Sequence, residues 1–267
     1  MNAFGGLPPS LAMASLDRPG NRGRRAAIGK LVALMTLAPA AWLAWGRVAD
    51  RGWIADQRTT TGERRELRLA DGTTIMLNSA SAIKVRYDDT HRLIQLRAGE
   101  IMVETARDTR LVKRPFVVDS AQGRLVALGT RFAVRQFEGR TAVSVLQSAV
   151  PIEPRKIGVE GQLVLRQGRQ AAFTSAAIEP EQALDPAAMA WTQGMLLAVN
   201  MPLAEFAAEL ARYRTGFIRV EPDIANLRVS GTFPVDDTNR TLSMLMSTYR
   251  IAIYERFDGY WVTLTSR

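Results

Sequence analysis

A single apolar run near the N-terminus limits what this chain can be. Residues 26–46, AAIGKLVALMTLAPAAWLAWG, hold one charged side chain, Lys30, among 21 positions. At about 1.5 Å of rise per residue, 21 helical residues span about 31 Å, close to the roughly 30 Å hydrocarbon core of a bilayer. Lys30 can keep its stem in lipid and its ammonium at the headgroups, and Trp42 and Trp45 suit the opposite interface. The run therefore predicts a transmembrane segment.

The charges on either side of this segment predict its orientation. Residues 17–30 hold five cations and one anion, whereas residues 47–58 hold three cations and two anions. Because the more positive flank stays in the cytoplasm, we expect a single-pass inner-membrane protein. Its residues 1–25 form a short disordered cytoplasmic tail, and its C-terminal domains lie in the periplasm.

Two other interpretations of the N-terminal region stay open. Arg24-Arg25 fits a twin-arginine export signal, although Ala27 stands where a bulky apolar residue is usual. Ala38-Pro39-Ala40 fits a small-residue cleavage site, which would release a soluble periplasmic protein. We favour the uncleaved anchor.

Composition argues against several classes of function. The chain has no cysteine, which removes disulfides, thiolate metal sites and cysteine nucleophiles. Its one histidine, His91, lies in a turn-like run and is expected in a surface loop, so neither a histidine metal cluster nor a Ser-His-Asp triad is expected. Of the net charge of +9, residues 1–58 contribute 8 − 3 = +5, and the other 209 residues carry 27 cations against 23 anions. We expect no cofactor, no metal and no nucleic-acid partner.

Residues 63–174 show the pattern of an all-β domain. Apolar residues alternate on both sides of Asp71-Gly72, which predicts a hairpin. Strands then follow every 8–12 residues with Gly, Asp or Pro between them, which is typical of layered β structure rather than βαβ units. Residues 162–173 add a last expected hairpin, and the remaining strands are expected within 82–89, 93–104, 115–120, 124–137 and 141–154.

The pattern changes after residue 174. Residues 175–190 are rich in alanine, proline and acidic side chains and are interpreted as a linker or a short helix. Residues 191–267 then predict a small α+β domain of order β-α-β, β-α-β, closed by a hairpin around Asp258-Gly259. The first helix begins near Pro202 with Asn200 as its cap, and the second is capped by Asp237 or Thr238. Their apolar faces are Leu203, Phe206, Leu210 and Tyr213, and Leu242, Leu245, Met246 and Tyr249.

Several short motifs, taken in order, resemble a known family. LADGT at 69–73, RAGE at 97–100, RPF at 114–116 and ALGTRF at 127–132 are similar to the periplasmic domain of FecR-type regulators of sigma factors. Residues 191–245 look like the end of the same family, which is similar to the short signalling domain of secretins and TonB-dependent transporters. The two matches cover about residues 63–267.

The resemblance implies a signal relay. An outer-membrane TonB-dependent siderophore transporter would offer its signalling domain to the C-terminal region, and the signal would regulate an iron-starvation, extracytoplasmic function sigma factor. Strand edges in the C-terminal domain could pair with a partner strand. The candidate contacts are Tyr254, Phe257, Tyr260 and Trp261. The alternative is that these aromatic side chains pack in the core or cover a sheet edge. Family members carry a cytoplasmic sigma-binding domain, which the 25 residues before the apolar run cannot form. Three explanations stay open: the true start of the protein lies further upstream, a separate protein binds the sigma factor, or the regulator uses a short tail.

The same resemblance implies a possible self-cleavage between Gly129 and Thr130. The threonine hydroxyl can attack the preceding carbonyl, and glycine removes the Cβ that would crowd this attack; a glycine in a tight turn is the alternative. Arg131, Glu100 and Glu104 could tune such a site.

Two other functions compete with the relay. A periplasmic hydrolase could use Glu100 and Glu104, which face the same side of a strand. A structural or assembly protein with a secretin-like module, not acting on a sigma factor, is the main alternative. We expect a binding protein rather than an enzyme.

Overall fold

The computed structural model describes residues 57–127 and 129–267, all within one contact unit of the chain, Ala49–Arg267. The predicted transmembrane segment, the N-terminal tail and the twin-arginine pair lie outside the described residues, as does Leu128. In the part of the chain that is described, no helix is both long and apolar enough to cross a membrane.

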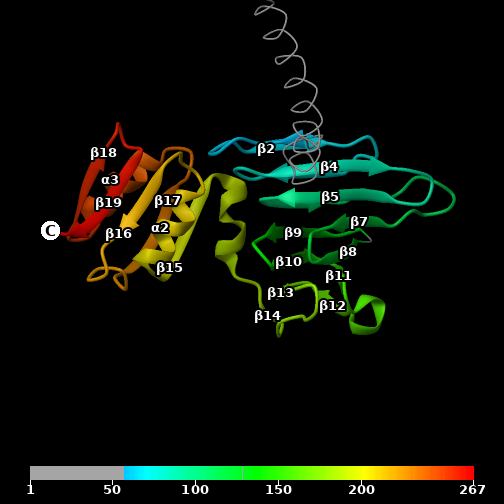
Figure 1. The fold of residues 1–267 in the computed structure, drawn as a ribbon. Coiled ribbons are helices and arrows are strands. Elements are labelled where there is room, and N and C mark those ends of the chain that lie inside the picture. The colour runs from blue at the N-terminus through cyan, green and yellow to red at the C-terminus, as the bar shows by residue number, and fades with distance from the viewer. Residues whose placement is uncertain (1–56, 128) are drawn as a thin grey trace, which may run out of the picture. The chain divides into compact units, whose positions relative to one another are not determined.

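Residues 57–183 form two seven-stranded sheets (Figure 1). The first sheet has the order β1-β4-β5-β7-β8-β11-β12, and the second has the order β14-β13-β10-β9-β6-β3-β2. The strands are β1 Gln57–Arg58, β2 Arg65–Arg68, β3 Thr74–Leu77, β4 Ala82–Tyr87, β5 Arg92–Ala98, β6 Glu100–Glu104, β7 Phe116–Asp119, β8 Gly123–Ala127, β9 Arg131–Gln136, β10 Thr141–Gln147, β11 Ala149–Pro154, β12 Leu163–Arg166, β13 Arg169–Phe173 and β14 Gln182–Ala183.

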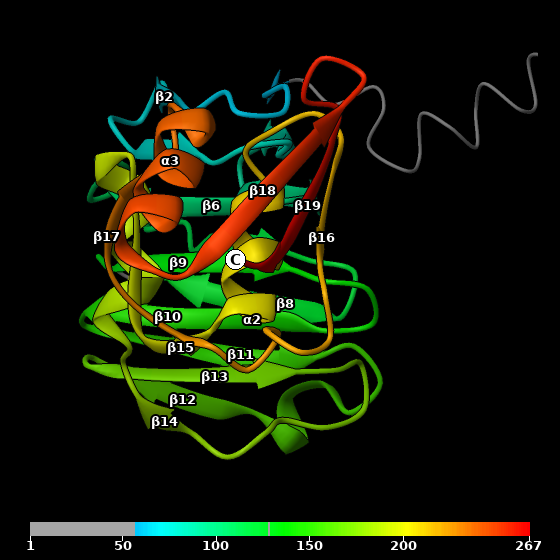
Figure 2. The same cartoon turned by 90° about the vertical axis from the view of Figure 1, so that its left-hand side faces the viewer.

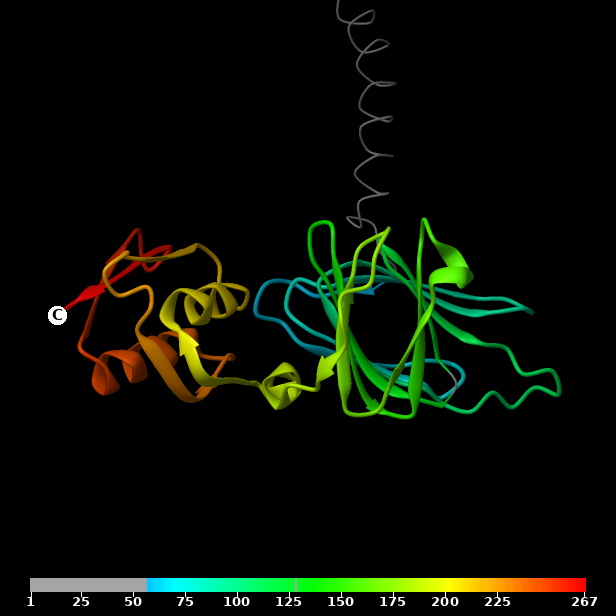
Figure 3. The ribbon, with the colours of Figure 1, turned by 90° about the horizontal axis from the view of Figure 1, so that it is seen from below.

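The core of this β domain lies between the two sheets, which face each other in Figure 3. Side chains at alternate strand positions supply it, since successive residues of a strand point to opposite faces. Ile75, Ile94, Phe132 and Ile152 are fully buried in this cluster. The predicted alternation is therefore confirmed, as is the hairpin of β2 and β3, in which Leu67 pairs with Ile75.

The hairpin predicted at residues 162–173 is wrong. β12 pairs with β11 in the first sheet, and β13 pairs with β10 in the second. The β10–β11 and β12–β13 segments instead run side by side and cross together from one sheet to the other. At the crossing, the Gln167 N–H donates to the Ser148 carbonyl and the Gly168 N–H donates to the Val145 carbonyl. Gly168, at φ +74°, supplies the left-handed conformation that this corner needs.

The C-terminal domain has the expected order of elements, β15-α2-β16 and β17-α3-β18, followed by β19 (Figure 2). β15 and β17 pair antiparallel, while β16, β19 and β18 form a separate sheet in which β16 runs parallel to β19. The bounds are η3 Pro186–Gln193, β15 Met195–Pro202, α2 Leu203–Ala211, β16 Phe217–Val220, β17 Arg228–Pro234, α3 Thr238–Thr248, β18 Ile251–Arg256 and β19 Trp261–Ser266; a further short turn of helix, η2, covers Gly158–Gly161.

The apolar stripe predicted for α2 is confirmed, because all four of its residues are buried. The predicted cap is wrong. Pro202 occupies the N-cap position without a side-chain hydrogen bond, and Asn200 lies within β15, where its N–H donates to Ser230 Oγ at 2.9 Å. A proline with φ near −57° already suits the helix start, so no side-chain cap is formed.

In α3 the predicted cap is confirmed, since the Asp237 carboxylate accepts a hydrogen bond from the Arg240 N–H at 2.9 Å. Leu242 and Leu245 are buried, whereas Met246 is 39% exposed. Met246 follows Leu245 directly, and the helical turn of about 100° per residue carries it off the buried stripe. Its assignment to the apolar face is therefore wrong.

Candidate functional site

One feature that ties the C-terminal domain to the β domain is a cluster of charged side chains, which we call the junction network: Glu100, Arg135, Glu209 and Arg212. Glu100 opens β6 and Arg135 lies opposite it on β9. Glu209 lies in the last turn of α2, and Arg212 follows that helix directly. Elements far apart in the sequence thus bring two acidic and two basic groups together.

The geometry of the junction network is that of linked ion pairs. Arg135 contacts Glu209 through two hydrogen bonds, at 2.8 and 3.0 Å. Arg212 bridges the two carboxylates, at 2.6 Å from Glu100 Oε2 and 2.9 Å from Glu209 Oε2. Paired geometry of this kind fixes orientation as well as charge.

Burial and neighbouring charge set the ionisation of this network. Burial alone would raise the pKa of Glu209, but its hydrogen bonds to Arg135 and the charges of Arg135 and Arg212 hold that pKa below its ordinary value. Burial would lower the pKa of Arg212, whereas Glu100 and Glu209 raise it above the ordinary arginine value. Glu209 and Arg212 are therefore charged at neutral pH, where each offsets the cost of burying the other.

Neutral groups complete the junction. Asn78 donates through Nδ2 to Glu100 Oε2 at 2.8 Å and to the Tyr213 hydroxyl at 2.9 Å.

A second charged pair joins the domains outside the junction network. Arg64 makes a bidentate ion pair with Asp236, at 2.8 Å to each carboxylate oxygen. The domains are thus held by polar contacts from two separate segments of the β domain.

A cavity of about 550 Å³ lies beside the junction network. Its walls include Ala133 and Ser144 of the second sheet, Trp191 of η3 and Met201 of β15. Trp191 is 4% exposed, and its Nε1–H has no hydrogen-bond partner within the described residues. The cavity thus has walls from both domains.

The hydrolase hypothesis finds no support in this arrangement. Glu100 and Glu104 lie four residues apart on β6, a separation of about 13 Å along a strand, which exceeds the spacing of paired catalytic carboxylates. Glu100 belongs to the junction network, whereas Glu104 is exposed and lies 3.8 Å from Arg131. Across the described ranges, no group of His, Asp and Glu could hold a metal ion. His91 is exposed in the β4–β5 turn, as predicted.

The proposed cleavage site lies between β8 and β9. Gly129 has φ +70° and open space around its Cα. Thr130 is 2% exposed, and its Oγ1 has no hydrogen-bond partner among the described residues. Thr105 holds its backbone from both sides, since the Thr130 N–H donates to Thr105 Oγ1 at 2.7 Å and its carbonyl accepts from the Thr105 N–H at 3.0 Å. Among the described residues, no hydrogen bond therefore competes for the Thr130 hydroxyl, while Thr105 holds the Thr130 backbone.

The four aromatic residues singled out in the last hairpin are exposed. Tyr254, Phe257, Tyr260 and Trp261 have exposed fractions of 63, 79, 51 and 38%. Phe217 of β16, which sequence reasoning missed, joins them at 55% and lies 5.7 Å from the Tyr260 ring and 5.6 Å from the Trp261 ring. The parallel pairing of Phe217 with Trp261 creates this cluster, and no local pattern signals such a pairing.

The chain resembles one family model in sequence and two solved structures in fold. Residues 55–151 match the family model described as FecR protein. Two crystal structures of a candidate anti-sigma factor from Parabacteroides distasonis have the same fold, each with 21% sequence identity. The first structure covers 80% of this chain and 100% of its own length, with a TM-score of 0.63. The second covers 79% of this chain and 98% of its own length, with a TM-score of 0.62. No curated protein matches the sequence.

Proposed function

We propose that this chain is a FecR-type regulator that relays a signal from a periplasmic protein contact to a sigma factor. The observation that carries the proposal is the match of residues 55–151 to the FecR family model. The name of the solved neighbours, a candidate anti-sigma factor, supports the same assignment. The junction network supports a relay, since a force on the C-terminal domain would pass through partly buried ion pairs into the β domain.

In this proposal the protein is held in the inner membrane by residues 26–46, with residues 1–25 in the cytoplasm and both folded domains in the periplasm. The upstream partner is the signalling domain of an outer-membrane TonB-dependent siderophore transporter. The downstream partner is an extracytoplasmic function sigma factor, reached directly or through a separate protein. The apolar run and its flanking charges support this arrangement.

The partner strand would add to the edge of the three-stranded sheet. β18 lies at that edge, and its N–H and C=O groups on the outer side are available for pairing. Tyr254 and Phe257 project from this hairpin with most of their surface in water. Contiguous exposed aromatic side chains of this kind mark interaction surfaces.

A pull-down tests this contact. Residues 57–267 are mixed with the N-terminal signalling domain of each TonB-dependent transporter that the same genome encodes. We expect binding that Tyr254→Ser with Phe257→Ser weakens at least about tenfold, because two anchors are lost. Val199→Ser is the matched control, since Val199 is 71% exposed on β15, in the other sheet. Equal binding by all three proteins would exclude the β18 edge.

A reporter assay tests the regulation. Deleting this chain's gene should change transcription from promoters of the sigma factor encoded beside it, and the full-length chain should restore it. Unchanged transcription with intact transporter binding would favour the structural or assembly role over a regulator.

Self-cleavage at Gly129-Thr130 is a separate part of the proposal. The Thr130 hydroxyl attacks the Gly129 carbonyl carbon, and the bond to the Thr130 nitrogen breaks, leaving an ester and a free amine. Water then hydrolyses the ester to a Gly129 carboxylate and restores the hydroxyl. Thr130 Oγ1 has no hydrogen-bond partner among the residues that the structure describes, which supports this step. Thr130→Ala should abolish the fragments on a gel and Thr130→Ser should keep them, with Thr109→Ala as the control; fragments that persist in Thr130→Ala exclude the reaction.

A further inference from the structure

The segment between β6 and β7, residues 105–115, presents two apolar side chains to solvent. Leu111 is 103% exposed and Val112 is 80% exposed, the highest values among the large apolar side chains that the structure describes. Two adjacent aliphatic residues with this exposure gain nothing from contact with the rest of the protein. Their surface is available to a partner.

Cations surround Leu111 and Val112, which we call the tip of this segment. Arg107, Arg110 and Lys113 are exposed within four residues of Leu111 or Val112. Arg110 pairs with Asp89 at 2.8 Å. Neither Arg107 nor Lys113 has an acidic partner in any ion pair between described residues. The tip therefore combines exposed aliphatic groups with an excess of positive charge.

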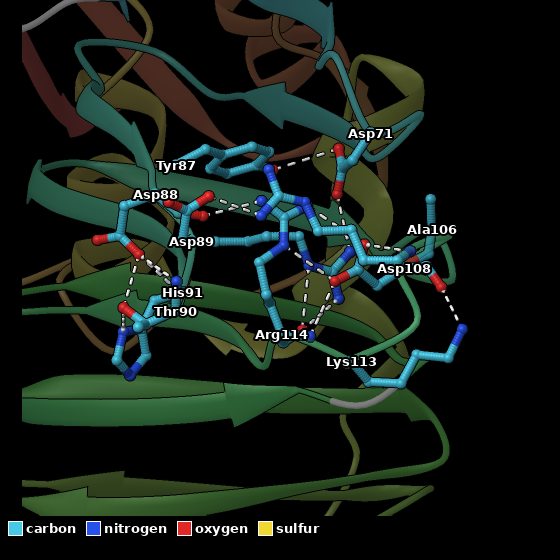
Figure 4. Close-up of polar contacts among 12 residues, drawn as sticks. Asp71, Tyr87, Asp88, Asp89, Thr90, His91, Ala106, Asp108, Lys113 and Arg114 are labelled. Carbon is cyan, nitrogen blue, oxygen red and sulfur yellow. Dashed lines mark hydrogen bonds and ion pairs between the residues drawn. The ribbon is translucent and has the colours of Figure 1, made fainter.

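A buried carboxylate holds the base of this segment in one conformation. Asp108, 6% exposed, accepts hydrogen bonds from the Arg114 N–H at 2.8 Å and from Arg114 Nε at 3.0 Å, as Figure 4 shows. The Lys113 ammonium donates to the Asp108 carbonyl at 2.6 Å. The side-chain hydrogen bonds from Arg114 keep the pKa of Asp108 well below its usual range. The Asp108–Arg114 ion pair is therefore present at every physiological pH.

A second buried arginine connects the segment to the sheet. Arg92, 2% exposed, donates to Asp71 Oδ2 at 2.8 Å and to the Ala106 carbonyl at 2.9 Å. Arg114 also reaches the Asp88 carbonyl at 2.9 Å in the β4–β5 turn. Because these contacts fix the base, the tip projects without the ordering cost that a floppy loop would incur on binding.

An anionic phospholipid surface fits this tip better than a folded protein does. Aliphatic side chains enter the boundary between headgroups and acyl chains, and arginine and lysine beside them interact with lipid phosphates. Residues 105–115 contain no aromatic side chain, the kind of anchor that dominates protein interfaces.

The length of the chain places a bilayer within reach. β1 begins at Gln57, opposite Ile83 of β4, and Ile83 is five residues, or about 17 Å, from Asp88 along the strand. The ten residues 47–56 separate β1 from the predicted membrane segment and span at most about 35 Å when extended.

We propose that the Leu111–Val112 tip, with Arg107, Arg110 and Lys113, docks the β domain onto an anionic phospholipid surface. The inference rests on the membrane location within the proposed function, but not on the sigma factor or the transporter. It gives the β domain a second attachment, which would orient it on the bilayer.

Vesicle co-sedimentation tests the inference with residues 57–267, which lack the apolar run. This fragment contains both hydrophobic cores, and a solved neighbour consists over its whole length of the matching fold. Vesicles with 30% phosphatidylglycerol should bind the fragment at 0.1 M salt, pure phosphatidylcholine vesicles should bind it far less, and 0.5 M salt should release it.

Two variants separate the parts of the tip. Arg107→Gln with Lys113→Gln should lower the partition coefficient roughly 25-fold, at roughly fivefold per cation. Leu111→Asp with Val112→Asp should lower it at least about tenfold. Val159→Asp is the matched control, because Val159 is 68% exposed in the short helix η2. An unchanged thermal midpoint shows that each variant is folded.

Two outcomes would overturn the inference. One is a fragment that ignores phosphatidylglycerol vesicles at low salt. The other is equal binding by the parent, the tip variants and the control. Retention of the tip by a soluble protein partner in the absence of vesicle binding would assign the tip to protein recognition instead.

Discussion

The junction network makes a quantitative prediction for Arg212→Ala. The substitution removes the partner of Glu100, whose side chain is 7% exposed and lies 2.6 Å from the Arg212 guanidinium. Breaking a fully buried ion pair from one side costs about 3–5 kcal/mol. The Arg212 side chain is 20% exposed, and Asn78 still donates to Glu100, so we expect a loss of about 2–3 kcal/mol in unfolding free energy.

Urea unfolding of residues 57–267, followed by tryptophan fluorescence, measures this loss. The fragment contains two tryptophans, Trp191 and Trp261, and Trp191 is buried beside the junction network. With a slope of about 2 kcal/mol per molar urea, the midpoint should fall by about 1–1.5 M.

A double variant and a control make the reasoning refutable. Glu100→Gln with Arg212→Met removes both charges and should regain at least half of the loss, because no unpaired charge stays buried. Arg169→Ala breaks an exposed pair with Glu181 at 3.0 Å and should stay within about 0.5 kcal/mol of the parent. A midpoint for Arg212→Ala as high as that of Arg169→Ala would refute the argument, as would a double variant no more stable than the single one.

Three further predictions concern single residues. Asp237→Ala removes the cap of α3 and should cost about 1 kcal/mol, seen as a fall of the calorimetric midpoint by about 2–4 °C; an unchanged midpoint would contradict the cap. Gly216→Ala would place a Cβ 2.0 Å from the Tyr260 carbonyl oxygen, at a residue with φ +101°. The unfolding free energy measured in urea should therefore fall by at least about 2 kcal/mol. An unchanged unfolding free energy would mean that the backbone segments at Gly216 and Tyr260 can separate. The folded-state pKa of Glu209 lies below its ordinary value of 4.5, so its stabilisation is complete above that pH and is lost as the pH falls below it; urea midpoints measured from pH 6 to 3 should show this loss, and Glu209→Gln should flatten it.

The strands and helices could be predicted because their signals are local. Ile75 and Leu77 alternate with half-buried positions, and Asp237 stands where a helix cap belongs. The pairing of β12 and β13 could not be predicted in the same way. Both strands have the right alternation for a hairpin, and only the hydrogen bonds at Ser148 and Val145 send them to different sheets.

The candidate site depends on contacts between distant residues, and this explains what sequence reasoning missed. Glu100 and Arg212 are 112 positions apart. Glu100 attracted attention as a possible catalytic group, yet its strand-mate Glu104 points to a different environment. Glu209 and Arg212 border the apolar stripe of α2, and a charge beside such a stripe is in most helices simply a solvated residue.

The position of β19 gives the C-terminal domain an unusual dependence on its final residues. β19 is the middle strand of its sheet, between β16 and β18, and it supplies the fully buried Val262 and Leu264. A ribosome that stops before Trp261, or a protease that trims the end, would leave both neighbouring strands without a ladder partner. Trp261 and the sheet that presents Phe217 and Tyr254 would be lost together, so the exposed aromatic surface depends on the last seven residues of the chain.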